Sequence, residues 1–451
     1  MRYLLKNHLY IIGFILITFF ACHLNWQTPP NLDEARAYSI ARHLSLIDIF
    51  SISKTEGHPF LWYYILKPIT FAHQFYPIPL YAINLIFMLI ALYIFYKSNA
   101  FPTYIKYFIT LSLPFLKLYN SFARCYSLTI MLSFITLSIY KKRFSNPLTY
   151  LTLLILLANS SATGFFIASS LYTLFFCENI FSKKAISSKL SIIFFGILEL
   201  LLLYIQFYDY NKQIPIITPK TNTLLNNLNL AYAPINTYIL SLIYLATFII
   251  FIKNKKYQPL LFLLFSSAQL TILITQIHQG GSHHYYFYYI YLICSYWLFN
   301  QLNHKYLLPL SILSLALIFN TNMHYKHKDK DFLALLKSSA VQINTLFPSA
   351  PQEIMIFEDY YSNIIAPYLN KNITLLNQTA TPLNTLKGFE EFFYFIYTPI
   401  KDEDIIKQAQ KNPNILFYKT CEEAILYRPT YSINLKHHLN EQYCLYDFKF
   451  Y

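Results

Sequence analysis

The chain of 451 residues is 55% hydrophobic and only 12% charged, with a formal net charge of +14 at pH 7. Apolar runs long enough to cross a hydrocarbon layer, which takes about 20 helical residues, recur from Leu9 to Asn320. This pattern excludes an ordinary soluble domain. Lys and Arg lie mostly in short loops between the runs, where they set membrane topology, so we expect no nucleic-acid partner.

The first apolar run, Leu9 to Leu24, follows Arg2 and Lys6 and has the layout of a signal peptide. Its end, at residues 22–26, reads Cys-His-Leu-Asn-Trp, which is a poor small-residue cleavage site. We therefore expect an uncleaved first span with a cytoplasmic N-terminus, so that the next segment is extracytoplasmic.

That next segment, Asn31 to Pro68, carries a dense set of charged and histidine side chains. A helix is expected from Asn31, lying on the membrane surface. Asp33 and Glu34 stand at its start. They can be catalytic carboxylates, or they can simply open the helix, with Asn31 as N-cap and the acids favoured by the helix dipole. The expected apolar face consists of Ala37, Ile40, Ala41, Leu44 and Ile47.

A second interfacial helix is expected to open at Glu56-Gly57-His58-Pro59, with the proline at the first helical position. Glu56 and His58 would direct a carboxylate and an imidazole at one region, although an ordinary turn can have the same residues. Pro59 to Phe75 is apolar enough to span. Treating it as a span, however, would place several basic loops on the extracytoplasmic side, against the positive-inside rule. These loops are Lys141 to Arg143, Lys183-Lys184, Lys253 to Lys256 and Lys305. We therefore expect an interfacial helix, which leaves all of them in the cytoplasm.

The predicted fold is a polytopic α-helical membrane protein of about eleven spans, whose odd number leaves the C-terminus outside. Residues 1–320 form the transmembrane domain in this interpretation. After the first span, the others run roughly over residues 77–97, 103–119, 121–140, 147–159, 161–178, 189–207, 237–252, 258–277, 285–301 and 305–320.

Residues 321–451 change composition and are expected to form a small extracytoplasmic α/β domain. Cys421 and Cys444 share this tail and can pair if it lies in an oxidising compartment. Strand-like runs at Glu353 to Phe357, Phe392 to Tyr397 and Ile415 to Tyr418 alternate there with helical patterns such as Asp402 to Asn412.

Three further positions carry chemistry. Arg124 lies at the outer end of a predicted span, where it can bind a phosphate or snorkel to lipid head groups. His283 and His284 follow an outer turn that holds two of the seven glycines, which suits phosphate or substrate contact, a plain loop, or a metal. Two adjacent histidines rarely ligate one ion and no third ligand is apparent, so no metal ligands are assigned, and a divalent metal stays an open cofactor. Glu199 lies deep in a span, as a proton or ion site or as a carboxylate hydrogen-bonded between helices.

The pair Asp33-Glu34, its continuation through residues 36–42 (Arg-Ala-Tyr-Ser-Ile-Ala-Arg) and the helix opening at His58-Pro59, all behind a first span, resemble the GT-C superfamily of lipid-sugar glycosyltransferases. The likeness is strongest to bacterial aminoarabinose transferases and protein O-mannosyltransferases. The former have Lys before the proline where this chain has His58, so a contact made by that lysine does not carry over.

The resemblance implies inverting transfer of a sugar from a polyprenyl-phosphate or polyprenyl-diphosphate donor to a lipid, glycan or protein acceptor on the outer face of a membrane, expected to be the bacterial inner membrane. Asp33 would be the general base, with Glu34 assisting. Donor phosphate or substrate contacts would come from Glu56, His58, Arg124, His283 and His284. The alternatives are a flippase or transporter of lipid-linked sugars, whose essential acid would be Glu199, and a polysaccharide polymerase or ligase.

Overall fold

The computed structural model describes most of the first 319 residues and parts of the remainder. The described residues are mostly helical. They are 12–13, 15–20, 30, 32–50, 58–180, 186–207, 228–229, 232, 237–277, 282–299, 305–319, 330–348, 352–356, 368–369, 373–376, 416–420, 427–428, 431–439 and 443–450.

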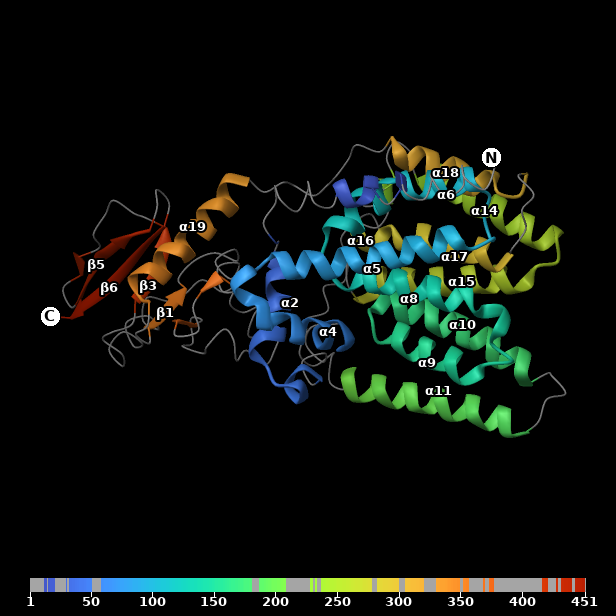
Figure 1. Ribbon diagram of the computed structural model, residues 1–451, viewed down its shortest axis with the longest axis horizontal. Helices are drawn as coiled ribbons and strands as arrows, with labels where there is room; N and C mark the ends of the chain where they lie inside the picture. Colours follow the sequence, from blue (N-terminus) through green and yellow to red (C-terminus); the bar gives the residue numbers. More distant parts are fainter. Residues whose placement is uncertain are drawn as a thin grey trace.

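A bundle of helices running along the long axis makes up the main body (Figure 1). Its centre is formed by α5 (Ile78–Lys97), α8 (Cys125–Ser138), α9 (Pro147–Ala158), α10 (Ala162–Ile180), α15 (Tyr257–Ile272) and α17 (Phe287–Phe299). Around it lie α6 (Thr103–Leu111), α11 (Ile186–Phe207), α14 (Thr237–Lys253) and α18 (Leu308–Ile318).

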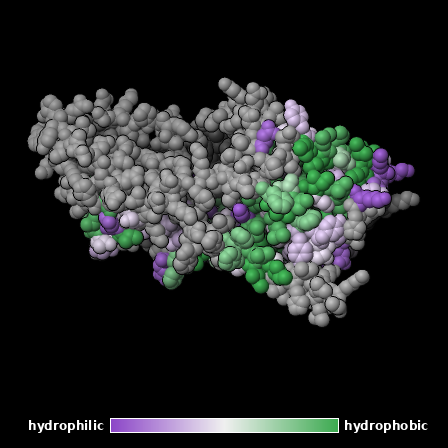
Figure 2. Space-filling model, turned by 90° about the horizontal axis from the view of Figure 1, so that it is seen from above, coloured by the Kyte–Doolittle hydropathy of each residue, from purple (hydrophilic) through white to green (hydrophobic). Residues whose placement is uncertain are grey.

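Among the described residues, two helices are long and apolar enough to cross a membrane, Ile78–Lys97 and Tyr257–Gln276. Five shorter apolar helices of 10 to 17 residues lie in the same body. Figure 2 shows hydrophobic residues gathered in broad patches on one face of the helical part, with hydrophilic residues at its right-hand end. Membrane association therefore agrees with the structure in coarse terms, while the count of about eleven spans stays a prediction.

Some predicted span boundaries differ from the helices that form. The predicted span 103–119 is broken, because α6 ends at Leu111 and a π-helical turn begins at Pro114, which has no N–H to continue the preceding helix. After the short α7 (Tyr119–Ser121) the backbone is extended at Phe122 and Arg124, and α8 begins only at Cys125. The predicted span 121–140 therefore starts too early, and the residues 122–124 form a non-helical segment.

The first predicted interfacial helix exists as α2 (Leu32–His43). Ala37, Ile40, Ala41 and Leu44 are buried as expected, but Ile47 is 82% exposed, so the predicted apolar face is wrong there. Ser45 explains the difference: its hydroxyl accepts the Asp48 N–H at 3.2 Å and donates to the Asp48 carboxylate at 2.7 Å. This local cap starts a new turn and takes Ile47 out of register with α2.

The second helix predicted to be interfacial forms as α4 (Leu61–Ile69), followed by a 3-10 segment, η1 (Thr70–Phe75). Phe60 is its N-cap, so Pro59 precedes the helix and the prediction of proline at the first helical position is wrong. Lys67 of α4 donates to the carbonyl oxygens of Arg42 at 3.3 Å and Leu44 at 2.5 Å. This cation satisfies carbonyls at the C-terminal end of α2 and ties α2 to α4. We call α2, α4 and η1 the platform.

One end of the bundle is strongly basic. Arg143, just after α8, pairs with Glu178 near the end of α10, with nitrogen–oxygen distances of 2.9 and 2.7 Å. Gln258 at the start of α15 also donates to Glu178. These bonds bring the loops around Lys141 to Arg143 and Lys253 to Lys256 to the same end, which we call the basic end. The platform contacts the opposite end of α5 (Figure 1).

The C-terminal part holds α19 (Lys330–Leu346) and a six-stranded mixed sheet, at the platform end of the molecule (Figure 1). The sheet order is β2-β1-β3-β6-β5-β4, with β1 parallel to β2 and β3 and the other pairs antiparallel. The strands are β1 (Gln352–Ile356), β2 (Ile373–Leu376), β3 (Leu416–Thr420), β4 (Tyr427–Arg428), β5 (Tyr431–His438) and β6 (Tyr443–Phe450).

β1 and β3 coincide with two of the predicted strand-like runs, whereas the β5–β6 hairpin was not predicted. The runs 392–397 and 402–412, Cys421 and the predicted domain boundary at 320/321 lie outside the described residues.

Replacing Lys67 with Ala should destabilise the platform, because two backbone carbonyls at the end of α2 lose their donor. The expected loss is about 1–3 kcal/mol, the cost of leaving buried acceptors unsatisfied. Thermal unfolding in detergent, followed by size-exclusion chromatography, measures it. Lys142→Ala is the matched control, because this exposed lysine lies at the other end of the bundle. Equal melting points for the two variants would contradict the role of Lys67.

Candidate functional site

Tyr126, the second residue of α8, lies at the centre of the predicted site residues. Its ring centroid is 6.4 Å from that of His58, 5.0 Å from that of His283 and 5.7 Å from that of His284. Its hydroxyl forms a 3.1 Å hydrogen bond with Nε2 of His284, which is 158 residues away in sequence. The start of α4, the start of α8 and the short α16 (Ser282–Tyr285) therefore meet at one place, at the platform end of the bundle.

Arg124 connects this place to α2. The side chain is buried, and its Nη1 donates to the backbone carbonyl of Asp33. The Asp33 carboxylate, half-buried on α2, attracts the guanidinium electrostatically. Nε of Arg124 is buried and has no hydrogen-bond partner among the described residues. A buried cation with an unused N–H beside a carboxylate is suited to an anionic or hydroxyl-bearing ligand.

Glu34 has a positioning role. It is 4% exposed, and its Oε1 accepts the backbone N–H of Ala123 at 2.6 Å. The bond runs from α2 to the extended segment 122–124, in which the N–H groups of Phe122 and Arg124 have backbone acceptors and that of Ala123 is taken by Glu34. Glu34 therefore fixes the residue before Arg124, while the proposed N-cap Asn31 and the candidate Glu56 lie outside the described residues.

Two asparagines complete the support of this segment. Asn84 of α5 is fully buried and donates to the carbonyl oxygens of Tyr119 at 3.1 Å and Asn120 at 2.9 Å. Asn120 in turn donates to the carbonyl oxygen of Ile17 at 2.7 Å. The break between α6 and α8 is thus held by side chains of helices on either side, and Arg124 is presented by a well-bonded backbone.

Aromatic rings hold the two histidines. The His283 ring lies 5.0 Å from that of Phe122 and 4.2 Å from that of His284, and the His283 carbonyl accepts the Tyr119 hydroxyl at 2.9 Å. Within the described part of the chain, no three His, Cys, Asp or Glu side chains come together in a way that could hold a metal ion. Both histidine rings thus pack against Tyr126 within an aromatic cluster.

Tyrosines line the α2 side, and one of them comes from the C-terminal part. The ring of Tyr76 lies 4.4 Å from that of Tyr38 and 5.0 Å from that of Tyr368, whose carbonyl accepts a 2.8 Å bond from Asn344 of α19. Burial raises the pKa of Tyr38 to about 12. Burial, together with the negative charge of Glu34, also raises the pKa of Tyr368. The effect of Glu34 on Tyr368 shows that the C-terminal part reaches the neighbourhood of this carboxylate.

Glu199 lies apart from these residues. Asn159, at the end of α9, donates to both of its carboxylate oxygens at 3.2 Å, so Glu199 is hydrogen-bonded between α9 and α11. This is the arrangement expected for a structural carboxylate within a helical bundle.

Comparisons with models of protein families, with curated proteins and with solved structures found no match for this chain.

Tyr126, Asn84 and Asn120 were missed from the sequence. Asn84 had a detectable signal, since an amide inside a long apolar run is costly unless a partner is present. Tyr126 had none, because this chain contains 42 tyrosines.

Glu34→Ala should destabilise the protein by about 1–3 kcal/mol, because the buried N–H of Ala123 loses its acceptor. Glu34→Gln should retain most of the stability, since an amide oxygen can accept the same bond. Melting temperatures in one detergent compare the three proteins. If Glu34→Ala has the same melting temperature as the wild type, the bond to Ala123 does not stabilise the fold.

Proposed function

We propose that the chain is an inverting glycosyltransferase that moves a sugar from a polyprenyl-phosphate or polyprenyl-diphosphate donor to an acceptor on the outer face of a membrane. One observation carries the proposal: His58, His283 and His284 lie around Tyr126, and Arg124, two residues before Tyr126, binds the carbonyl of Asp33, so that residues of four separate elements meet. The resemblance of the first outer segment to GT-C transferases supports it from the sequence.

Asp33 is the general base in this mechanism. It accepts the proton of the acceptor hydroxyl as that oxygen attacks the anomeric carbon, and the bond from this carbon to the donor phosphate oxygen breaks. Its backbone carbonyl is fixed by Arg124, so the carboxylate extends from a rigid helical turn. One displacement of this kind inverts the anomeric configuration.

Arg124 stabilises the leaving phosphate. The departing oxygen gains negative charge, and a buried guanidinium acts on it more strongly than a solvated one would. The unused Nε–H of Arg124 provides a directed donor, and His283 and His284 lie on the other side of Tyr126. The same arginine would thus attract the base before reaction and the phosphate during it.

The proposed orientation places the platform and the C-terminal part outside and the basic end in the cytoplasm, as the positive-inside rule favours. Arg143, Lys141 and Lys253 to Lys256 lie at the end of the bundle away from the platform. The site would then lie at the outer membrane surface, where a lipid-linked donor presents its phosphate and a hydrophilic acceptor has access.

Asp33→Asn should reduce sugar transfer by at least about 100-fold, because the amide cannot accept the proton. The protein should stay folded, since Arg124 bonds the backbone carbonyl, which Asn retains. The assay is restoration, by each variant, of the envelope glycan or lipid that disappears on gene deletion, measured by mass spectrometry. Glu199→Gln is the control that separates a transferase from a transporter. The mechanism is wrong if the Asp33→Asn variant restores the product. It is also wrong if the Glu199→Gln variant alone fails to restore the product.

Arg124→Gln should weaken binding of the donor phosphate about 10- to 100-fold, as expected for the loss of a charge-assisted hydrogen bond. Polyprenyl phosphate, the leaving group, is a direct probe, and its affinity for the purified protein can be measured by native mass spectrometry. Lys142→Gln removes an equal charge at the basic end and should leave this affinity unchanged. Unchanged binding in Arg124→Gln would mean that the arginine only snorkels to head groups.

A further inference from the structure

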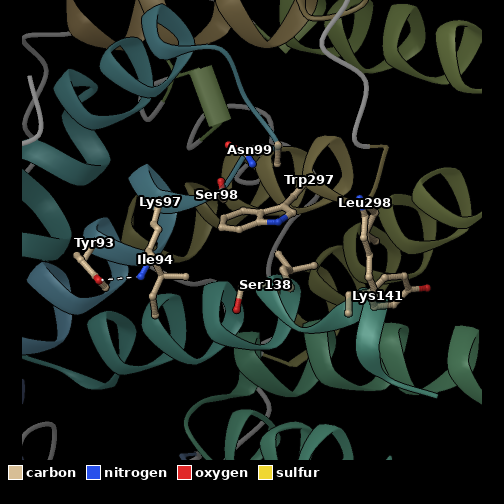
Figure 3. Close-up of a pocket in the computed structure, with 12 residues that line it drawn as sticks. Tyr93, Ile94, Lys97, Ser98, Asn99, Ser138, Lys141, Trp297 and Leu298 are labelled. Atoms are coloured by element: carbon tan, nitrogen blue, oxygen red, sulfur yellow. Dashed lines mark hydrogen bonds between the residues drawn. The ribbon is translucent and has the colours of Figure 1, made fainter. Parts of the chain in front are cut away.

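A pocket lies at the basic end of the bundle, away from the candidate site. Its volume is about 490 Å³, and it is enclosed by the C-terminal ends of α5, α8 and α17. Figure 3 shows the Trp297 indole between Lys97, Ser98 and Asn99 on one side and Leu298 on the other, with Ser138 nearby. The proposed glycosyl transfer does not use this pocket.

The pocket is positively charged. Lys97 and Lys141 line it, both are exposed, and none of its lining residues is acidic. Glu178, the nearby acid of this end, is already paired with Arg143. A third cation, Lys106 of α6, is buried behind the lining and donates to the carbonyl oxygens of Tyr96 at 2.7 Å and Ser98 at 2.5 Å. An anion in the pocket would therefore lie among cations from α5, α6 and the turn after α8.

Helix C-termini attract lysines by themselves, and this effect accounts for part of the charge. Lys106 already provides it for α5, because it binds carbonyls at the end of that helix. The Lys97 ammonium uses one donor on the Tyr93 hydroxyl at 3.1 Å, which leaves donors for a ligand. The helix-dipole effect would place lysines here but would not create a cavity. In this structure, two lysines lie at the rim of a cavity large enough for a ligand.

The remaining lining indicates the ligand. Asn99 provides an amide next to the lysines that can donate to phosphate oxygens, whereas the hydroxyls of Ser98 and Ser138 already donate to the carbonyl oxygens of Phe95 at 2.8 Å and Ile135 at 2.7 Å. Trp297 is 7% exposed and presents an indole to the pocket, and Tyr93 is an exposed aromatic on the bundle surface. Aromatic rings of this kind favour the depth of lipid head groups, and basic pockets between spans on the cytoplasmic side bind phosphorylated head groups.

We propose that this pocket binds the phosphate of an anionic phospholipid of the inner leaflet, with Lys97 and Lys141 as the charged contacts. The proposal rests on the membrane orientation given above and is independent of the sugar-transfer chemistry. Such a lipid would fill the gap between the ends of α5, α8 and α17, whose helices also reach the candidate site at their other ends.

The test is native mass spectrometry of the full-length protein released from nanodiscs that contain phosphatidylglycerol or phosphatidylcholine. The wild type should retain phosphatidylglycerol in preference to phosphatidylcholine. The double variant Lys97→Gln/Lys141→Gln should lose this preference, with phosphatidylglycerol affinity reduced at least about tenfold. The double variant Lys142→Gln/Lys253→Gln is the matched control: it removes the same charge from exposed positions at the same end that do not line the pocket.

Retention by the control and loss by the pocket variant would establish the site. Equal losses in both variants, or equal retention of both lipids by the wild type, would overturn it, since only the general surface potential would then act. Adding soluble glycerol 3-phosphate distinguishes a lipid from a free phosphate. If it does not reduce the retention of phosphatidylglycerol, the ligand is a lipid. If it displaces phosphatidylglycerol completely, the pocket binds a soluble anion and the lipid proposal is wrong. Failure of the Asp33 variant test leaves these outcomes unaffected.

Discussion

The hydrogen bond from the Ala123 N–H to the Glu34 carboxylate is the contact on which the proposed site depends. It joins α2, which carries Asp33, to the short extended segment that carries Arg124. The next residue, Arg124, returns a bond to the Asp33 carbonyl, so two adjacent residues of each segment are bonded crosswise. The two bonds fix the backbone of Asp33 against Arg124, and under the proposed mechanism such preorganisation would lower the reorganisation cost of a charge-forming step.

The non-helical segment 122–124 is stable because polar side chains form hydrogen bonds with backbone groups in and just before it. In a helical bundle, backbone groups outside helices are costly unless they are paired. Asn84 binds the carbonyls of Tyr119 and Asn120, and Glu34 binds the Ala123 N–H. The buried polar groups of this region thus follow from one structural cost, that of pairing backbone groups outside helices.

The sequence predicts the helical class, the helix at α2 and two of the C-terminal strands, because apolar periodicity and chain polarity determine these locally. It does not predict where α2 ends, since the Ser45 cap competes with an apolar pattern that continues to Ile47. It also misses the break at Pro114 inside one long apolar run. Apolar content shows that a segment is buried or in lipid, but a single proline or cap decides where a helix stops.

The site itself was predictable as residue types and not as an assembly. Asp33 and His58 stand out through the resemblance of the first outer segment, His283 through its glycine-containing turn, and Arg124 as a cation at the outer end of a predicted span. Only the fold shows that Tyr126 lies among these segments. The role of Glu34 changes most. As a neighbour of Asp33 it was expected to assist the base, yet a carboxylate that is buried and already holds a backbone N–H is poorly available to shuttle a proton. Its carboxylate instead positions Arg124 through the N–H of Ala123, and its charge adds to the effect of burial in raising the pKa of Tyr368, so the C-terminal part lies near the same carboxylate.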